Sequence, residues 1–125
     1  MDAKLWIDEN GIIREQHESA VITWETAMGA AAERARLAGE KKMPLLVEFK
    51  KMFAFSTETR ELPTDVILKN VSALGYLVLD GSIGQSQQLT IRNYFEKTPW
   101  PIAVDIFFNM QEALAWLKEY AETAN

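Results

Sequence analysis

The stretch Pro44-Leu45-Leu46-Val47-Glu48-Phe49 decides the fold class, because apolar residues at nearly every position are typical of a strand buried on both faces. Leu74-Gly75-Tyr76-Leu77-Val78-Leu79 follows the same pattern, and so does Ile102-Ala103-Val104-Asp105-Ile106-Phe107. Pro99 and Pro101 precede the third stretch, where they fit the beginning of a strand better than its interior. The sequence therefore predicts three strands, of which the first two are of the buried type.

Helical patterns separate and follow these strands. Apolar residues at helical spacing predict helices over about 24–38, 56–62, 64–71 and 83–96, and from 110 onward. We expect Thr23, Ser56 and Ser82 to cap three of these helices through their side chains. Asn109 and Glu112 have the spacing of a capping box at the start of the last helix.

The chain begins with a predicted hairpin. Asn10-Gly11 separates two strand-forming runs, 4–9 and 12–15, and this dipeptide is the strongest local sign of a two-residue hairpin turn. The order of elements is then ββαβαβαβα, in which helices join parallel strands by right-handed crossovers. We therefore predict one α/β domain over residues 1–125, with a mixed five-stranded sheet, about four helices packed mainly on one face, and a frayed end at 122–125.

Composition and charge remove several classes of function. The chain has 125 residues, which is the size of one ordinary domain. Its 18 Asp and Glu outnumber its 13 Lys and Arg, and a net charge of −5 argues against general binding to nucleic acid. No apolar run approaches the length of a membrane span, and residues 1–4 lack the pattern of a secretion signal. We expect a cytoplasmic protein.

Chemistry that needs cysteine or several histidines is also excluded. The chain has no Cys and one His, His17, so it has no disulfide, no thiolate nucleophile and no cysteine-ligated zinc. A metal site would need mostly carboxylate ligands, and no loop has their spacing. We expect no cofactor, no metal and no catalytic residue, and we expect a partly exposed His17. Carboxylate pairs such as Glu58 and Glu61 leave acid–base chemistry open as an exception.

The order of elements and several motifs together resemble the STAS fold, named for sulfate transporters and bacterial anti-sigma-factor antagonists. The stretches that carry the resemblance are Leu5-Trp6-Ile7, Pro44-Leu45-Leu46-Val47, Ser56-Thr57-Glu58-Thr59-Arg60-Glu61, Ile91-Arg92-Asn93-Tyr94-Phe95 and Glu112-Ala113-Leu114-Ala115-Trp116-Leu117-Lys118. The whole chain looks most like a small bacterial group labelled STAS/SEC14-like, many of whose members have no assigned function.

This resemblance implies a regulatory module that binds partner proteins. In the antagonist branch, a loop after the third strand carries Asp-Ser-Ser/Thr-Gly, and an anti-sigma kinase phosphorylates its hydroxyl. The corresponding stretch here is Phe55-Ser56-Thr57-Glu58-Thr59, which places Glu58 at the phosphorylated position, or Thr57 after a one-residue slip. Neither register restores both the Asp and the Gly of the family motif.

Two regions are candidate binding sites. The predicted docking surface and candidate phosphoacceptor loop consists of Lys50, Lys51, Ser56, Thr57, Glu58 and Arg60. Ordinary helix capping and a solvated basic rim also explain these residues. The candidate ligand-binding turn consists of Asp80, Gly81, Ser82 and Gly84, between a strand and a helix, where N–H groups can bind anions. An ordinary turn also explains this second set.

Two functions therefore remain open. We expect a non-catalytic regulatory or protein-interaction module, with an unidentified protein partner and self-association into a homodimer. The alternative is a lipid-carrier-like domain that binds a small apolar or anionic ligand between the Asp80 turn and the Ser56 helix start.

Overall fold

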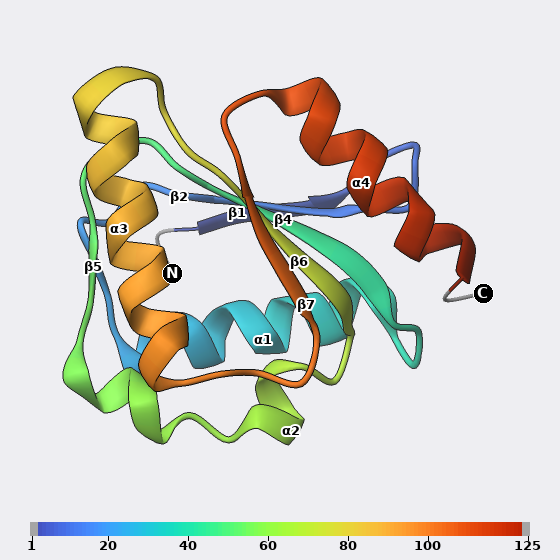
Figure 1. Cartoon of the computed structure of the whole chain (residues 1–125). Helices are drawn as coiled ribbons and strands as arrows, with labels where there is room; N and C mark the ends of the chain where they lie inside the picture. Colours follow the sequence, from blue (N-terminus) through green and yellow to red (C-terminus); the bar gives the residue numbers. More distant parts are fainter. Residues whose placement is uncertain (1–2, 124–125) are drawn as a thin grey trace.

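A five-stranded mixed sheet forms the centre of the chain in a computed structural model that describes residues 3–123 (Figure 1). The strand order is β1-β2-β4-β6-β7. β1 pairs with β2 antiparallel, and the pairs β2–β4, β4–β6 and β6–β7 are parallel. The predicted α/β fold with a mixed five-stranded sheet and four helices is confirmed. Residues 1–2 and 124–125, which the predicted domain and frayed end included, lie outside the described residues.

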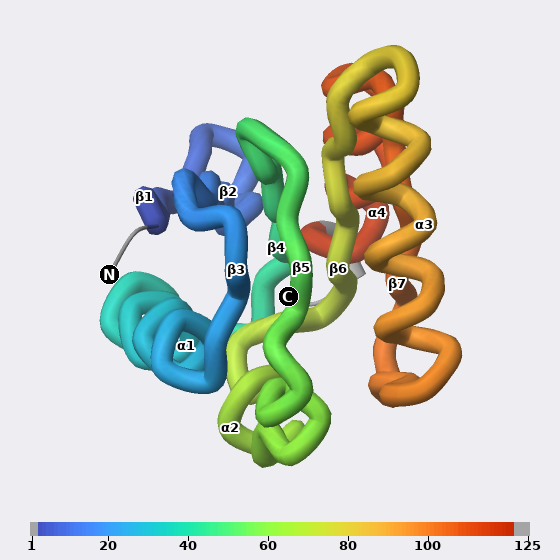
Figure 2. Tube along the Cα trace, turned by 90° about the vertical axis from the view of Figure 1, so that its left-hand side faces the viewer, coloured from blue at the N-terminus to red at the C-terminus, as the bar shows by residue number. Residues whose placement is uncertain are grey.

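The elements have the following bounds. The strands are β1 (Ala3–Ile7), β2 (Ile13–His17), β3 (Val21–Ile22), β4 (Met43–Phe49), β5 (Ala54–Phe55), β6 (Val71–Leu77) and β7 (Ala103–Phe107). The α-helices are α1 (Trp24–Ala38), α2 (Thr64–Ile67), α3 (Gly81–Lys97) and α4 (Met110–Thr123), and η1 (Thr57–Glu61) is a 3₁₀ helix. The two-residue strands β3 and β5, which the sequence did not predict, pair in parallel beside the main sheet (Figure 2).

Helices cover both faces of the sheet. Alternate residues of β4 belong to different clusters: Leu45 and Val47 pack with side chains of α1, α2 and α3, whereas Leu46 packs with α4. Gly75 in β6 permits the close approach of α4, because a Cβ there would lie 3.3 Å from Leu117 Cδ1. The prediction that helices pack mainly on one face is therefore confirmed for three helices, and α4 supplies the cover for the other face.

Local turn and cap signals are confirmed in part. The hairpin forms, but its loop is longer than two residues, and Asp8 Oδ1 accepts bonds from Asn10 N and Ile12 N at 2.9 and 3.1 Å. Only Gly11 in this loop has positive φ, at +75°. Thr23 caps α1 by accepting from Thr26 N at 3.1 Å.

Two of the predicted caps are wrong. Ser56 precedes η1 but its side chain makes no cap bond; its main-chain oxygen instead accepts from Thr59 Oγ1 at 2.6 Å. Ser82 lies inside α3, which begins one residue earlier with Asp80 as its N-cap residue. The Asn109 cap is confirmed, since its Oδ1 accepts from Glu112 N at 3.1 Å.

No helix in the described range 3–123 has both the length and the apolar character needed to cross a bilayer.

Candidate functional site

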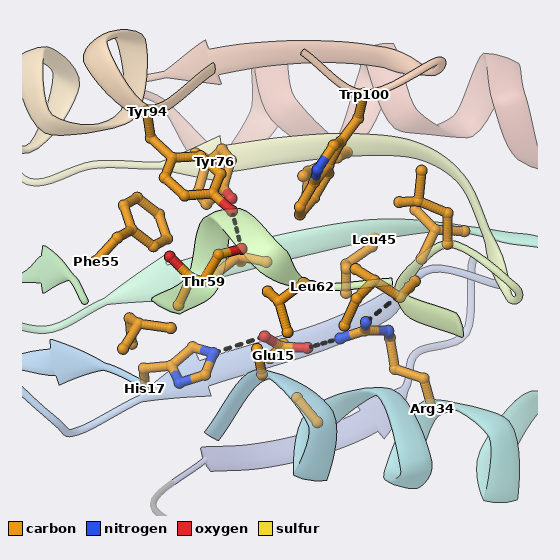
Figure 3. Close-up of a pocket in the computed structure, with 18 of the residues that line it drawn as sticks. Glu15, His17, Arg34, Leu45, Phe55, Thr59, Leu62, Tyr76, Tyr94 and Trp100 are labelled. Atoms are coloured by element: carbon orange, nitrogen blue, oxygen red, sulfur yellow. Dashed lines mark hydrogen bonds and ion pairs between the residues drawn. The ribbon is translucent and has the colours of Figure 1, made fainter. Parts of the chain in front are cut away.

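An internal cavity lies between the sheet and the helices of its more heavily covered face (Figure 3). It leaves about 60 Å³ of space for water-sized molecules. Most of its lining is apolar or aromatic, from β4, β6, α1, α2 and α3. Three charged or titratable side chains, Glu15, His17 and Arg34, line one side of it.

These three side chains form a buried ionic cluster. The strand period of two places Glu15 and His17 on the same face of β2 as Ile13, and Arg34 reaches them from α1. Arg34 Nη1 lies 2.7 Å from Glu15 Oε1, and His17 Nε2 donates to Glu15 Oε2 at 2.6 Å. Arg34 Nη2 also donates to the main-chain oxygen of Ile67 at 3.0 Å. Each of the three residues is at most 5% exposed, so the cluster is closed to solvent.

The charges of the cluster set the protonation of Glu15. Burial alone would raise the pKa of its carboxyl group, but the Arg34 charge and the hydrogen bond and charge of His17 more than offset burial. The pKa of Glu15 is therefore lowered, and the group is a carboxylate at neutral pH. Because both its oxygens already accept from cationic or N–H donors, Glu15 is not a free general base.

Two tyrosines near the cluster stay protonated. Burial, followed by the nearby charge of Glu15, raises the pKa of Tyr76. Burial also raises the pKa of Tyr94, whose hydroxyl donates to Thr59 O at 3.0 Å. This hydrogen bond joins α3 to η1 across the cavity, so the Tyr94 hydroxyl has a structural role.

The expectation of a partly exposed His17 is wrong. The residue is 3% exposed and its ring stacks on Phe49, with centroids 5.3 Å apart. Its Nδ1 atom is buried and has no hydrogen-bond partner among the described residues. The alternation of Ile13, Glu15 and His17 along β2 was a sign in the sequence that all three share one face of the strand. Burial of charged groups on that face could be predicted only if their partners, which are distant in the sequence, were known.

A second hollow lies at the carboxyl ends of β4, β6 and β7, and we name it the carboxyl-end groove. It has a volume of about 310 Å³ and is lined by Glu48, Phe49, Lys50, Leu77, Val78, Leu79, Asp80, Phe108 and Met110. The main-chain turns that follow the three parallel strands thus meet at one edge of the sheet, where ligands commonly bind in open α/β sheets.

Two polar side chains, Glu48 and Gln87, hold the walls of this groove through four contacts. Glu48 is paired with Arg14, with 2.7 Å between Oε1 and Nη2, and also accepts from Gln16 at 3.1 Å. Gln87 is fully buried; its Oε1 accepts from Leu79 N at 2.8 Å and its Nε2 donates to Lys51 O at 2.9 Å. Sequence reasoning did not single out Gln87, because a polar residue in a polar helix gives no sign of burial.

Gly84 explains how close α3 comes to this groove. A Cβ at Gly84 would lie 1.5 Å from the main-chain oxygen of Leu79, so no larger residue fits without a backbone shift. The same Cβ would lie 3.4 Å from Phe108 Cε1, which places that ring against the first turn of α3. Gly81, at φ +74°, supplies the left-handed conformation at the start of the helix.

A third hollow, which we name the Arg60–Lys97 groove, lies against the carboxyl-terminal half of α3. It has a volume of about 240 Å³ and is lined by Ala54, Phe55, Ser56, Arg60, Thr90, Asn93, Tyr94 and Lys97. The sequence placed Ser56 and Arg60 in a candidate site but not the α3 residues, because α3 and β5 approach one another only in the folded chain.

The structure separates the six predicted docking residues, and Lys51 lines neither groove. Lys50 lines the carboxyl-end groove together with Asp80, whereas Ser56 and Arg60 line the Arg60–Lys97 groove. Thr57 and Glu58 are exposed on η1 and line neither. Phosphorylation of Thr57 stays a prediction.

The predicted pocket between the Asp80 turn and the Ser56 helix start is not formed. Asp80 precedes the first turn of α3, whereas Ser56 shares a groove with α3 residues from Thr90 to Lys97. At 1.5 Å per helical residue, these places are roughly 15–25 Å apart along the helix. No group of His, Cys, Asp and Glu within residues 3–123 is arranged to hold a metal ion.

The chain belongs to a family of unknown function: the family model described as "Domain of unknown function (DUF7793)" matches residues 5–121. The match extends from β1 into α4, so the internal cavity and both grooves lie inside the family's domain. Searches of curated proteins and of solved structures find no match.

Proposed function

We propose that this domain is a non-catalytic protein-interaction module and that its docking surface is the carboxyl-end groove. The observation that carries the proposal is the exposure of large apolar side chains at the groove: Leu79 is 38% exposed and Phe108 is 45% exposed. Ile83, in the first turn of α3, is 46% exposed. Single exposed apolar residues are common, but a group of them around one hollow is typical of an interaction site.

The charges around the groove favour an acidic partner. Lys50 and Lys51 are exposed, and neither forms an ion pair with a described residue. Glu48 is paired with Arg14, which also lies 3.7 Å from Asp8, so Asp80 is the only lining carboxylate without an ion-pair partner in the described chain. α3 and α4 both begin at this edge of the sheet (Figure 1), and their N-termini add partial positive charge.

The partner that fits these features is an acidic segment that inserts one large apolar side chain between Leu79 and Phe108. Its carboxylates would lie near Lys50 and Lys51. In a chain with a net charge of −5, Lys50 and Lys51 are thus two unpaired cations that an acidic partner could contact. The resemblance to the STAS fold also favours a protein-binding, regulatory role.

The lipid-carrier-like alternative has less support. The internal cavity leaves about 60 Å³, whereas pockets that enclose small-molecule ligands usually have volumes of roughly 300–1,000 Å³. An acyl chain would enter only after α1, α2 or α3 moved away from the sheet.

A display library of short random peptides, selected on the immobilised domain, tests the proposal with a defined probe. We expect enriched peptides that combine a large apolar residue with neighbouring Asp or Glu. A selected peptide should bind Phe108→Ser at least about tenfold more weakly, because burying one large apolar side chain contributes about 1.5–3 kcal/mol. Lys50→Glu should weaken binding as well, and the loss should shrink at high salt.

Leu89→Ser is the matched control. Leu89 is the most exposed large apolar residue of α3, at 60%, and it does not line the carboxyl-end groove. Peptide binding should be the same for this variant as for the unchanged domain. Enrichment of basic peptides, or equal losses for Phe108→Ser and Leu89→Ser, would overturn the proposed docking surface.

A further inference from the structure

We propose that the Arg60–Lys97 groove is a binding site for an oxyanion of the phosphate class, independent of the docking surface. The groove is lined by two cationic side chains and by no carboxylate. The two cations are Arg60 and Lys97, in a chain where 18 acidic residues outnumber 13 basic ones. A hollow of about 240 Å³ with this lining offers an anion a site that the rest of the acidic surface does not.

Both cations are available to a ligand. Arg60 on η1 and Lys97 at the end of α3 are exposed, and neither forms an ion pair within residues 3–123. The guanidinium group of arginine can bind two phosphate oxygens at once, and the ammonium group of lysine adds a second charge from α3. Arg60 lines this groove together with Tyr94, whose ring therefore lies in the same hollow as the guanidinium.

Neutral donors in the groove complete the site. The Ser56 hydroxyl is buried in the groove wall and has no hydrogen-bond partner among the described residues, so a rotation of this side chain toward the groove would let a ligand satisfy it. Asn93 is exposed on α3 and presents an amide in the same hollow. Thr90 is different, because its hydroxyl already donates to Ser86 O at 3.0 Å.

The apolar part of the groove limits the kind of ligand. Phe55 and Tyr94 lie with ring centroids 4.2 Å apart, and both line the hollow beside the cations. The site therefore suits a phosphate or pyrophosphate group attached to an organic body better than a fully hydrated ion. A soluble phosphate ester and a phospholipid headgroup share this chemistry, so the experiment has one arm for each source.

The first arm is a titration of the ¹⁵N-labelled domain with inorganic pyrophosphate, followed by its amide signals. We expect the shifted signals to include those of Ser56, Arg60, Asn93 and Lys97. Arg60→Gln and Lys97→Gln should each raise the Kd at least about tenfold, as expected for the loss of one charge-assisted hydrogen bond. The thermal midpoints should be unchanged, because both side chains are exposed.

Arg92→Gln is the matched control, because it removes one positive charge from the same helix without touching the groove. It should leave the Kd nearly unchanged. In the second arm, phosphatidylcholine vesicles with and without phosphatidic acid are sedimented with the same variants. Loss of vesicle binding in Arg60→Gln but not in Arg92→Gln would support the site and identify a lipid headgroup as its source.

Two results would overturn the proposal. In one, the three variants lose pyrophosphate and vesicle binding equally, which would mean diffuse attraction to positive charge. In the other, neither probe binds. Neither result would affect the peptide-binding test, because Phe108 and Lys50 belong to a different groove.

Discussion

Replacing Arg34 by methionine should test whether the buried ionic cluster is a coupled structural unit. Arg34→Met keeps most of the apolar stem but removes two contacts: the 2.7 Å pair with Glu15 and the 3.0 Å bond to Ile67 O. The Glu15 carboxylate, 5% exposed, would then keep only His17 as a donor. Removing one partner of a buried ion pair costs about 3–5 kcal/mol, because the remaining charge is neither solvated nor paired.

The measurement is urea unfolding at neutral pH, with thermal unfolding as a second readout. A loss of this size corresponds to a fall of roughly 10–20 °C in Tm for a domain of this length. The double variant Glu15→Gln/Arg34→Met leaves no buried carboxylate, and the Gln oxygen can still accept from His17. We therefore expect it to be more stable than Arg34→Met alone, with a coupling free energy of about 1–3 kcal/mol between the two sites.

Arg36→Met is the matched control for this experiment. Arg36 lies on the same helix and pairs with Glu33, but that pair is on the surface and should leave the unfolding midpoint unchanged. If Arg34→Met unfolds at the same urea concentration as Arg36→Met, the cluster does not carry the stability we assign to it. Strict additivity of Glu15→Gln and Arg34→Met would refute the coupling.

Three further outcomes can be checked on the same protein. Folding lowers the pKa of the Glu15 carboxyl group, so the unfolded chain binds a proton at Glu15 more readily than the folded chain does. The free energy of unfolding that Glu15 contributes should therefore be complete above the unfolded pKa near 4.5 and lost as the pH falls through the folded pKa. Urea unfolding at several acidic pH values measures this loss. Gly84→Ala should destabilise the fold by about 1–3 kcal/mol and shift the amide signals of the carboxyl-end groove, since its Cβ would overlap Leu79 O; a native spectrum and midpoint would contradict this. On the open edge of β7, the Asp105 side chain accepts from Ile106 N at 2.8 Å, and an Asn side chain could accept in the same way. Asp105→Val should therefore increase self-association measured by analytical ultracentrifugation, whereas Asp105→Asn should not. Equal behaviour of the two variants would show that this hydrogen bond does not protect the edge.

The last prediction also bears on the expected homodimer. Phe107 O accepts from Val78 N, so the main-chain N–H and C=O groups of Phe107 point toward the neighbouring chain segment at the end of β6. The main-chain groups of Ile106 point the other way, toward the open edge of the sheet. The main-chain N–H of Ile106 therefore lies at the edge of the sheet, where it donates to the Asp105 carboxylate. A homodimer stays a proposal, and we expect it to use a surface other than a continuous sheet through β7.

Local signals in the sequence were sufficient for most elements. The apolar runs at 45–49 and 102–107 fall within or closely match β4 and β7. For β4 the reason is that a strand covered on both faces needs apolar residues at successive positions. Thr23 and Asn109 cap helices as predicted, since a cap depends on residues within one turn of it. The adjacent Phe107 and Phe108 show the limit of such reasoning: Phe107 packs on Trp116 of α4, while Phe108 lies beyond the end of β7 and is exposed.

The sequence by itself determined the class of fold, the order of the strands along the chain and the absence of thiol chemistry, because these depend on composition and on contacts between near neighbours. Only the tertiary structure decided which side chains meet. Arg34 reaches Glu15 across 19 positions, and Lys97 shares a groove with Arg60 across 37. The cost of burying His17, or of leaving Arg60 unpaired, depends on those distant partners, and no period or cap motif in the chain encodes them.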